Sequence, residues 1–207
     1  ALGAEYGVLA VAADAPWRDL TDLLEAWRRD PGSLVVSGGS AVAGQDHMKV
    51  LLLVHRAGLD ARRIRYVPFD GGGEAMTALL GGFVQVFSGE ASEVEGQVAA
   101  GRMRVLTVLA PERQRGILEG VPTAHEAGLD VDWVTWRGFY VPGGIGDERY
   151  AEWVDVLRQV GASPQWEEAR RANRLEPFLL VGPEFEAFVK RQVRDFRDMS
   201  REIGLIP

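Results

Sequence analysis

Short apolar runs recur along the first half of the chain, and each of them predicts a buried strand. They span residues 6–12, 34–36, 64–69, 84–87 and 103–109. The stretches between these runs carry apolar residues at helical spacing, first between Pro16 and the Asp30-Pro31-Gly32 stop. Strands that alternate with helices of this length predict an α/β fold, with a parallel sheet and helices on both faces.

The pattern changes after residue 128. One more apolar run, residues 133–141, predicts a strand, and three helices follow it. Two of these helices carry large apolar stripes, formed by Tyr150, Trp153, Val154 and Leu157 in the first and by Phe185, Phe188, Val189, Phe196, Met199 and Ile203 in the last. Because few strands follow residue 141, we expect the stripes to cover a sheet built from sequence outside these 207 residues.

Three of the predicted strands end in turns of small residues that lead directly into helices. These turns lie at residues 37–46, 69–74 and 88–90. In an open parallel sheet such turns lie along one edge, where ligands bind. Glycine lets backbone N–H groups approach a ligand closely, and a helix N-terminus carries about half a positive charge. The turns therefore predict a site for an anion, although any α/β fold also needs short turns of this kind.

Charge and composition narrow the functional classes. The net charge of −7, with 30 acidic and 23 basic residues, argues against a nucleic-acid-binding face. The absence of cysteine excludes disulfides, thiolate metal sites and cysteine nucleophiles. No apolar run approaches the roughly 18 residues of a membrane helix, so we expect no direct membrane insertion. Neither phosphate-binding glycine motif is present, which disfavours a nucleotide.

Few residues are candidates for catalysis. His47 is interpreted as a ligand contact or a cap, His55 as a surface residue and His125 as a residue at a helix start. The histidines do not have the metal-binding spacing of i, i+4. Glu90 and Glu93 could act as acid and base, but carboxylates in a first helical turn are more often partners of the helix dipole. We therefore predict no enzyme activity, no metal and no cofactor.

An ordered set of motifs covers nearly the whole chain. It comprises SGGSAVAGQDH at 37–47, YVPFDGGGE at 66–74, ALLGG at 78–82, AGRMRVL at 100–106, VPTAHEAGL at 121–129, WRGFYVPGGI at 136–145, SPQW at 163–166, and a tail with Glu184-Phe185 ahead of Ile203-Gly-Leu205. In this order the motifs resemble the substrate-binding proteins of tripartite tricarboxylate transporters, also called Bug-type periplasmic binding proteins.

The resemblance implies a periplasmic-binding-protein-like fold of type II, with two doubly wound lobes that close on a small di- or tricarboxylate. Backbone N–H groups and small hydroxyls at helix starts would hold the carboxylates. Carried onto this chain, the contacts implied are Gly39, Ser40, Gly44, Gln45, Asp46, Asp70, Gly71, Gly72, Ser88 and Gly89. Asp46 and Asp70 are interpreted as acceptors for ligand hydroxyls or water, or as caps of their own turns.

The sequence departs from the family at three places. Many relatives have an acidic residue where Gln85 stands and Asp where Gly89 stands, so amino acids, dicarboxylates and aromatic acids remain open as ligands. Family members also begin with a longer segment that forms the other side of the cleft, and nothing here corresponds to it. We therefore expect residues 13–130 to form the complete second lobe. Residues 1–12 and 131–207 are expected to form the cross-over strands and the C-terminal part of an incomplete first lobe.

The function implied is capture of a citrate-like carboxylate outside the cytoplasm, in the periplasm, for the integral-membrane subunits of a transporter. The protein is expected to be a monomer without a nucleic-acid partner. The alternative left open is a sensory or regulatory module of the same fold that detects a carboxylate.

Overall fold

A computed structural model describes residues 1–206, which form two compact units. Unit 1 contains Ala1–Glu5 and Thr135–Met199, and unit 2 contains Tyr6–Val134 and the chain from Ser200 onward. The boundaries fall inside the first and sixth strands and near the end of the last helix. Residues 6–12 and 131–134 pack with the larger unit, and the sequence predicts cross-over strands in these parts of the chain. The assignment of whole lobes stays a prediction.

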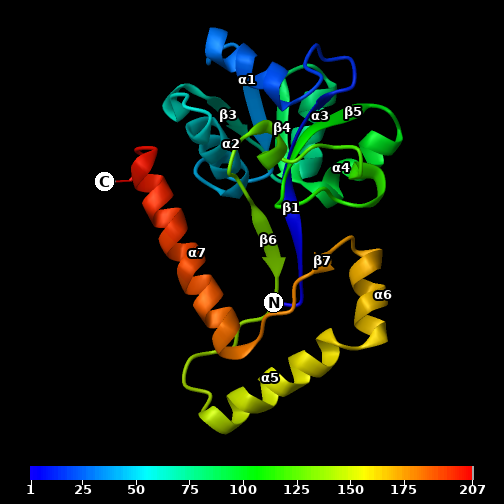
Figure 1. The fold of residues 1–207 in the computed structure, drawn as a ribbon, viewed down its shortest axis with the longest axis vertical. Helices are drawn as coiled ribbons and strands as arrows, with labels where there is room; N and C mark the ends of the chain where they lie inside the picture. Colours follow the sequence, from blue (N-terminus) through cyan, green and yellow to red (C-terminus); the bar gives the residue numbers. More distant parts are fainter. Residues whose placement is uncertain (207) are drawn as a thin grey trace. The chain divides into compact units, whose positions relative to one another are not determined.

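Unit 2 is built on a sheet in the order β3-β2-β4-β1-β5, from β1 (Gly3–Ala12), β2 (Val35–Gly38), β3 (Arg65–Pro68), β4 (Val86–Glu90) and β5 (Met103–Leu109) (Figure 1). β2 pairs in parallel with β3 and β4, whereas β1 is antiparallel to both β4 and β5. The predicted parallel sheet is therefore parallel except for β1.

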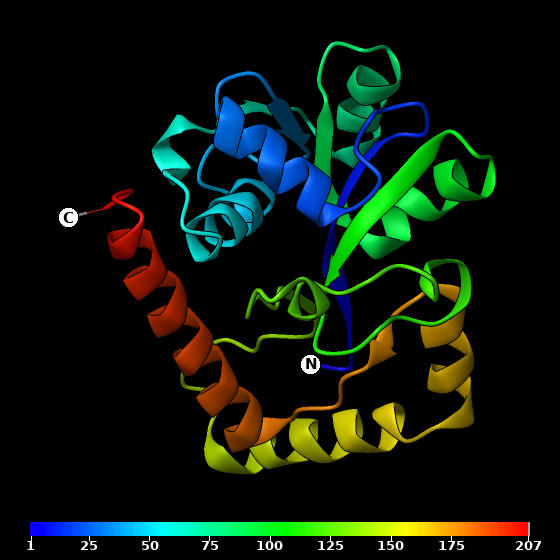
Figure 2. The same ribbon diagram turned by 45° about the horizontal axis from the view of Figure 1, so that its top comes forward.

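Four helices accompany this sheet: α1 (Leu20–Arg29), α2 (Gln45–Arg56), α3 (Gly72–Leu80) and α4 (Ala91–Ala99). The step from β2 to β3 and the step from β3 to β4 run in opposite directions across the sheet, so right-handed connections place α2 and α3 on opposite faces. Figure 2 shows α1 in front of the sheet and α4 behind β5. This is the two-faced cover that the sequence predicts.

The core of unit 2 follows the alternation of side chains along β1. Val8 and Ala10 face the side where α3 and α4 bury Leu79 and Val94. The residues between them, Leu9 and Val11, point to the opposite face and are also fully buried. A strand buried on both faces explains why the run at residues 6–12 shows no polar alternation.

Residues 88–90 differ from the prediction. Ser88, Gly89 and Glu90 are not a turn, because they continue β4 in register with Leu9, Val8 and Gly7 of β1. The antiparallel partner β1 extends the ladder beyond the end of the apolar run. Helix α4 follows the strand without an intervening residue, with Glu90 as its N-cap.

Unit 1 contains three helices and two short strands. They are β6 (Val134–Arg137), α5 (Asp147–Gly161), α6 (Pro164–Ala172), β7 (Glu176–Pro177) and α7 (Gly182–Glu202). β6 is shorter than the predicted strand at 133–141, because glycines and a proline follow it. β7 pairs with Gly3 and Ala4 of β1, and the sequence did not indicate it. Three 3₁₀ turns, Ala61–Arg63, Gly116–Leu118 and His125–Ala127, lie in unit 2.

The predicted apolar stripes of α5 and α7 are only partly covered within the described residues. No residue of α5 is buried, and Trp153 is 48% exposed. In the stripe of α7, Phe196 is 37% exposed, whereas Met199 and Ile203 are buried. Its other members, Phe185, Phe188 and Val189, are half-buried. Helices in water rarely leave such stripes open, because their stability comes mainly from burying them.

A buried ion cluster joins α2 to the end of β4. The side chain of Lys49 is 0% exposed, and its Nζ lies 2.8 Å from Asp46 Oδ1 and 2.9 Å from Glu90 Oε1. The same ammonium donates to the carbonyl oxygen of Gly89 at 2.9 Å. A Cβ on Gly7 would lie 2.6 Å from Lys49 Cδ, so glycine in β1 leaves the space for this side chain. One ammonium therefore holds the first turn of α2 against the carboxyl end of β4.

Replacing Lys49 by Met should destabilise the protein strongly. The substitution leaves two buried carboxylates without their cation, which costs about 3–5 kcal/mol of unfolding free energy when a buried pair is broken. Urea unfolding measures this loss. Lys190→Met is the matched control, because Lys190 is the other lysine of the chain and pairs with Glu186 on an exposed face. Its expected cost is below about 1 kcal/mol. Equal small losses in both variants would contradict the structural role of Lys49.

Candidate functional site

The carboxyl ends of three neighbouring parallel strands meet at one edge of the unit 2 sheet. We name them turn 1 (residues 38–46, after β2), turn 2 (residues 69–74, after β3) and junction 3 (residues 88–93, from β4 into α4). Since β2 lies between β3 and β4, turn 1 is the central element. Such an edge is where open α/β sheets bind ligands.

Turn 1 and turn 2 are in direct contact through their main chains. The amide of Phe69 donates to Gly38 O at 2.9 Å, and that of Gly71 donates to Gly39 O at 3.3 Å. A Cβ on Gly39 would lie 2.4 Å from Gly72 N, so the backbones touch at a position that excludes any side chain. The hydroxyl of Tyr66 also donates to Ser40 O at 2.8 Å. Glycine at position 39 is therefore required by close backbone approach.

Junction 3 is bound to turn 1 through buried polar groups. The hydroxyl of Ser88 donates to the carbonyl oxygen of Asp46 at 2.7 Å, and Lys49 links Asp46 to Glu90. Ser88 and Asp46 are 0% and 4% exposed. Both side chains thus have partners within the protein and hold the turns together.

Glu93 closes the third side, between turn 2 and junction 3. Its Oε2 accepts from the Glu90 amide at 2.9 Å in a capping box at the start of α4. A Cβ on Gly72 would lie 2.2 Å from Glu93 Oε1, and a Cβ on Gly89 would lie 2.5 Å from Oε2. The carboxylate therefore lies against glycine main chain of both elements, and each of the three elements contacts the other two.

The first turns of the helices supply free donors at this edge. In the part of the chain that the structure describes, the amides of Gly72 and Gly73 have no acceptor, as expected at the start of a helix. Gly71 has φ 100° and ψ 159°, a conformation that favours glycine, so a side chain there would strain turn 2. Unpaired N–H groups at a helix start bind anions.

The remaining predicted residues of turn 1 shape the start of α2. Gly44 is the N-cap of the helix, with Gln45 exposed after it. The hydroxyl oxygen of Ser40 accepts from the Asp46 amide at 2.9 Å. In turn 2, Asp70 is exposed and its amide donates to Glu74 at 3.4 Å. The structure thus brings all ten predicted site residues to one edge, and we propose below which of them contact a ligand.

His47 holds turn 1 from within. Its Nδ1 accepts from the Ala43 amide at 3.0 Å, and its ring stacks on Tyr66 with centroids 4.4 Å apart. Ala43 has φ 63°, which is unusual for a residue with a side chain, so the hydrogen bond supports a strained turn. Burial lowers the pKa of His47, and burial also raises the pKa of Tyr66.

Sequence reasoning missed three residues of this edge: Lys49, Tyr66 and the bridging position of Glu93. Lys49 could have been noticed because it is a charged residue inside an apolar helical run, where a buried charge needs a partner. The partner Glu90 is 41 residues away, and nothing local indicates the pairing.

The two single-residue departures from the family pattern, Gln85 and Gly89, have structural explanations. The side chain of Gln85 accepts from the Val35 amide at 3.0 Å, at the opposite end of β4 from junction 3. Gly89 has no room for a side chain, because a Cβ there would lie 2.3 Å from Phe87 Cζ. Gln85 therefore acts in strand pairing, and Gly89 accommodates Phe87 and Glu93.

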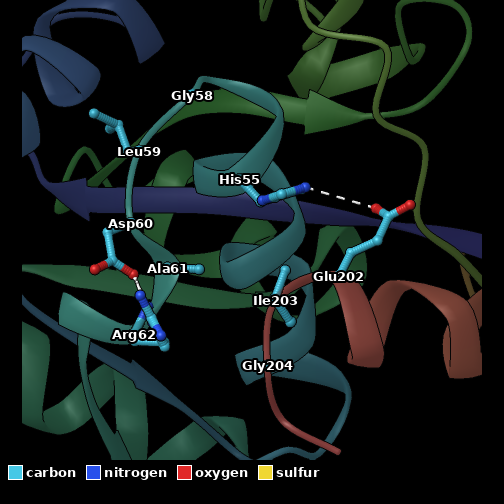
Figure 3. Close-up of a pocket in the computed structure, with 9 residues that line it drawn as sticks. All are labelled: His55, Gly58, Leu59, Asp60, Ala61, Arg62, Glu202, Ile203 and Gly204. Atoms are coloured by element: carbon cyan, nitrogen blue, oxygen red, sulfur yellow. Dashed lines mark hydrogen bonds and ion pairs between the residues drawn. The ribbon is translucent and has the colours of Figure 1, made fainter. Parts of the chain in front are cut away.

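A crevice of about 540 Å³ lies elsewhere in unit 2, at the far end of α2 (Figure 3). It is lined by His55, Gly58, Leu59, Asp60, Ala61, Arg62, Glu202, Ile203 and Gly204. Its charged groups pair with one another: His55 Nε2 lies 3.6 Å from Glu202 Oε2, and Arg62 Nε lies 3.1 Å from Asp60 Oδ1. No predicted site residue lines this crevice, so it carries no functional assignment.

The other candidates for chemistry are also paired. His125 Nε2 lies 2.9 Å from Asp132 Oδ1, and the hydroxyls of Ser37 and Ser88 bond to main-chain carbonyl oxygens. Among the described residues, no group of three or more His, Cys, Asp or Glu side chains could hold a metal ion. No helix in the described range is both long and apolar enough to cross a membrane.

Comparison with known proteins identifies relatives of the chain. The sequence profile of the "Tripartite tricarboxylate transporter family receptor" (TctC) matches residues 2–205. A curated relative, the "UPF0065 protein in tcbD-tcbE intergenic region" of Pseudomonas sp. (strain P51), is 34% identical over 139 residues. The match covers 66% of this chain and 40% of that protein, so the chain spans well under two thirds of this relative.

Solved structures share the fold at low sequence identity. A TctC solute-binding protein from Polaromonas, solved without ligand, has a TM-score of 0.79 at 23% identity, covering 97% of this chain and 67% of its own. A Rhodopseudomonas palustris protein solved with adipate has a TM-score of 0.77 at 20% identity, covering 98% and 67%. MatC from the same organism, with bound malate, has a TM-score of 0.76 at 21% identity, covering 96% and 67%.

These likenesses confirm the predicted fold class, and the profile match extends over nearly the whole chain. The chain belongs to the tripartite tricarboxylate transporter family receptors.

Proposed function

We propose that the full-length protein is an extracytoplasmic solute-binding protein that captures a small di- or tricarboxylate for a tripartite tricarboxylate-type transporter. The observation that carries the proposal is the meeting of turn 1, turn 2 and junction 3, with unpaired amides at a helix start. The adipate and malate held by two relatives of the same fold support a carboxylate as the ligand. Citrate-like specificity is part of the proposal.

Backbone donors explain how a chain with a net charge of −7 can hold an anion. The N–H dipoles act over a few ångströms, whereas exposed charges farther away than about 8–10 Å are largely screened by salt. An amide donor also needs no counter-charge and is not titratable. The site can therefore favour an anion while the surface of the protein stays acidic.

Within this proposal, two groups of residues have different parts. The ligand contacts are the main chain of Gly71 and Gly72 in turn 2, with Asp70 beside them, and Gly39, Ser40, Gly44 and Gln45 in turn 1. Asp46, Ser88 and Gly89 act by holding the elements together, because their polar groups are bonded within the protein or they leave space for neighbours. The protein would act without turnover and without a cofactor or metal.

The partners follow from the same proposal. The ligand-bound protein would be recognised by the integral-membrane subunits of the transporter, in the periplasm or another extracytoplasmic space. We propose that it works as a monomer and without nucleic acid.

The geometry of turn 1 depends on a neutral His47. Protonation of Nδ1 would remove the acceptor for the Ala43 amide, in a turn that is already strained at Ala43. Burial lowers the pKa of His47 below its ordinary value of about 6.5, so the folded state resists this protonation. The unfolded chain binds the proton more readily than the folded one, and folding therefore weakens as the pH falls.

The free energy of unfolding should consequently be highest above about pH 6.5 and decline as the pH falls from there through the lowered pKa of His47. The decline from this one group is at most about 1.4 kcal/mol per pH unit. His47→Asn keeps an acceptor near Nδ1 but does not titrate, so its stability should change less between pH 6.5 and 5. Urea unfolding at several pH values measures this. The idea fails if His47→Asn and the wild type have the same slope.

Carboxylate capture is tested by calorimetric titration of the full-length protein with citrate, succinate, malate and adipate. We expect saturable heat from at least one of them. Gly39→Ala should weaken that binding at least about tenfold, since its Cβ would lie 2.4 Å from Gly72 N and force turn 1 away from turn 2. Gly96→Ala is the control, because Gly96 lies in α4 outside the three elements and a Cβ there meets nothing within 4 Å.

Circular dichroism shows whether each variant is folded. Folded wild-type protein that takes up none of the four acids would overturn the proposal. Unchanged affinity in a folded Gly39→Ala variant would remove turn 1 and turn 2 from the site.

A further inference from the structure

The last helix passes from one unit of the chain into the other. Helix α7 is continuous from Gly182 to Glu202, but its residues up to Met199 belong to unit 1, and the chain from Ser200 onward belongs to unit 2. We name residues 200–206 the tail. Strands β1 and β6 also cross the boundary between the units, so the tail ends a third connection. Such a connection restricts how far two units can separate, provided that its end stays fastened.

One apolar side chain fastens the tail within unit 2. Ile203 is 5% exposed, and it lines the crevice of Figure 3 together with Leu59 and Ala61, which lie between α2 and β3. A Cβ on Gly204 would lie 3.8 Å from Arg62 Cδ, so the backbone of the tail lies beside the same segment. The tail is therefore attached to the connection between α2 and β3.

The polar contacts of the tail are weak. Glu202 Oε2 lies 3.6 Å from His55 Nε2 and 3.9 Å from Arg56 Nη1, and the three side chains are 51%, 35% and 47% exposed. Exposed pairs of this kind contribute little, because water and salt screen them. The crevice of about 540 Å³ beside them shows that the tail is not closely packed there (Figure 3). The attachment therefore depends mainly on Ile203, and few contacts need to break for the tail to detach.

We propose that the tail is a releasable fastening that limits the separation of the two units and thereby supports ligand binding. The inference rests on the proposed function, in which two lobes close on a carboxylate. Separated arrangements of two linked bodies are more numerous than closed ones, so an additional link removes mainly the separated arrangements. A ligand that needs the closed form binds more weakly when that form is less populated. Release of the tail should therefore weaken carboxylate binding, although no tail residue belongs to turn 1, turn 2 or junction 3.

Ile203→Ser tests the fastening, and Ile206→Ser is its matched control. Both variants replace an isoleucine of the tail, but Ile203 is 5% exposed and Ile206 is 42% exposed. The full-length protein is titrated calorimetrically with whichever of citrate, succinate, malate and adipate the wild type binds most tightly. The dissociation constant of Ile203→Ser should be at least about fivefold higher than that of the wild type. Ile206→Ser should bind as the wild type does. A folded Ile203→Ser variant with wild-type affinity would overturn the inference.

A cross-link distinguishes loss of the fastening from damage to the binding site. These 207 residues contain no cysteine, so His55→Cys and Glu202→Cys introduce two thiols that a short bifunctional maleimide can join. In the Ile203→Ser background, the cross-linked protein should regain the affinity of the wild type, because the link replaces the fastening. The same protein without the reagent should stay weak. Affinity that stays low after complete cross-linking, as shown by mass spectrometry, would contradict the role of the tail.

The proposed function and the fastening fail in different ways. If the wild type binds one of the acids and the folded Ile203→Ser variant binds it equally well, carboxylate capture stands and the fastening is wrong. If the folded wild-type protein binds none of the four acids, the proposed function falls and the inference falls with it. Circular dichroism under the conditions of the titration shows whether each protein is folded.

Discussion

The arrangement at the sheet edge depends on one buried ammonium. Lys49 lies in α2 and joins Asp46 of its first turn to the end of β4; it contacts Asp46, Gly89 and Glu90 within 2.9 Å. Burying a charge is costly unless it is paired and hydrogen-bonded, and here Glu90 and a carbonyl accept from the ammonium while Asp46 forms an ion pair with it. Such a cluster gains little net stability over a well-packed apolar core. Its consequence is geometrical, because two hydrogen bonds and the ion pair with Asp46 determine where α2 begins relative to β4.

Close contact between glycine main chains provides the second constraint. Gly39 lies against Gly71 and Gly72, and Gly89 lies against Phe87 and Glu93, at distances that exclude a Cβ. Turns that pack backbone to backbone cannot slide past one another without breaking their hydrogen bonds. The donors of turn 2 are therefore held in place before any ligand arrives, which reduces the ordering cost of binding.

The sequence was sufficient for the order of elements and for the edge at which the turns meet. Local signals place most of these features: the stop at Asp30 ends the first helix, and glycine clusters at 37–46 and 69–74 follow strands. The start expected near Pro16 is early, because the helix begins at Leu20 after its N-cap Asp19. The sequence was insufficient where distant residues decide. Ser88 and Gly89 read as a turn because their strand partner, β1, lies about 80 residues earlier in the chain. The sequence around Lys49 indicates an ordinary helix position, because its partner Glu90 and the neighbouring Gly7 are distant in the chain.

Binding by backbone amides also limits how well an anion site can distinguish its ligands. Amide donors attract any carboxylate, so they give affinity without much discrimination among acids of similar size. Discrimination needs a group that treats two acids differently, and Asp70 is an exposed carboxylate beside these donors. It repels a ligand carboxylate that comes near, but it can accept a hydrogen bond from a ligand hydroxyl. A fixed set of donors combined with one acidic acceptor therefore recognises the arrangement of groups within a ligand, which net charge alone cannot do.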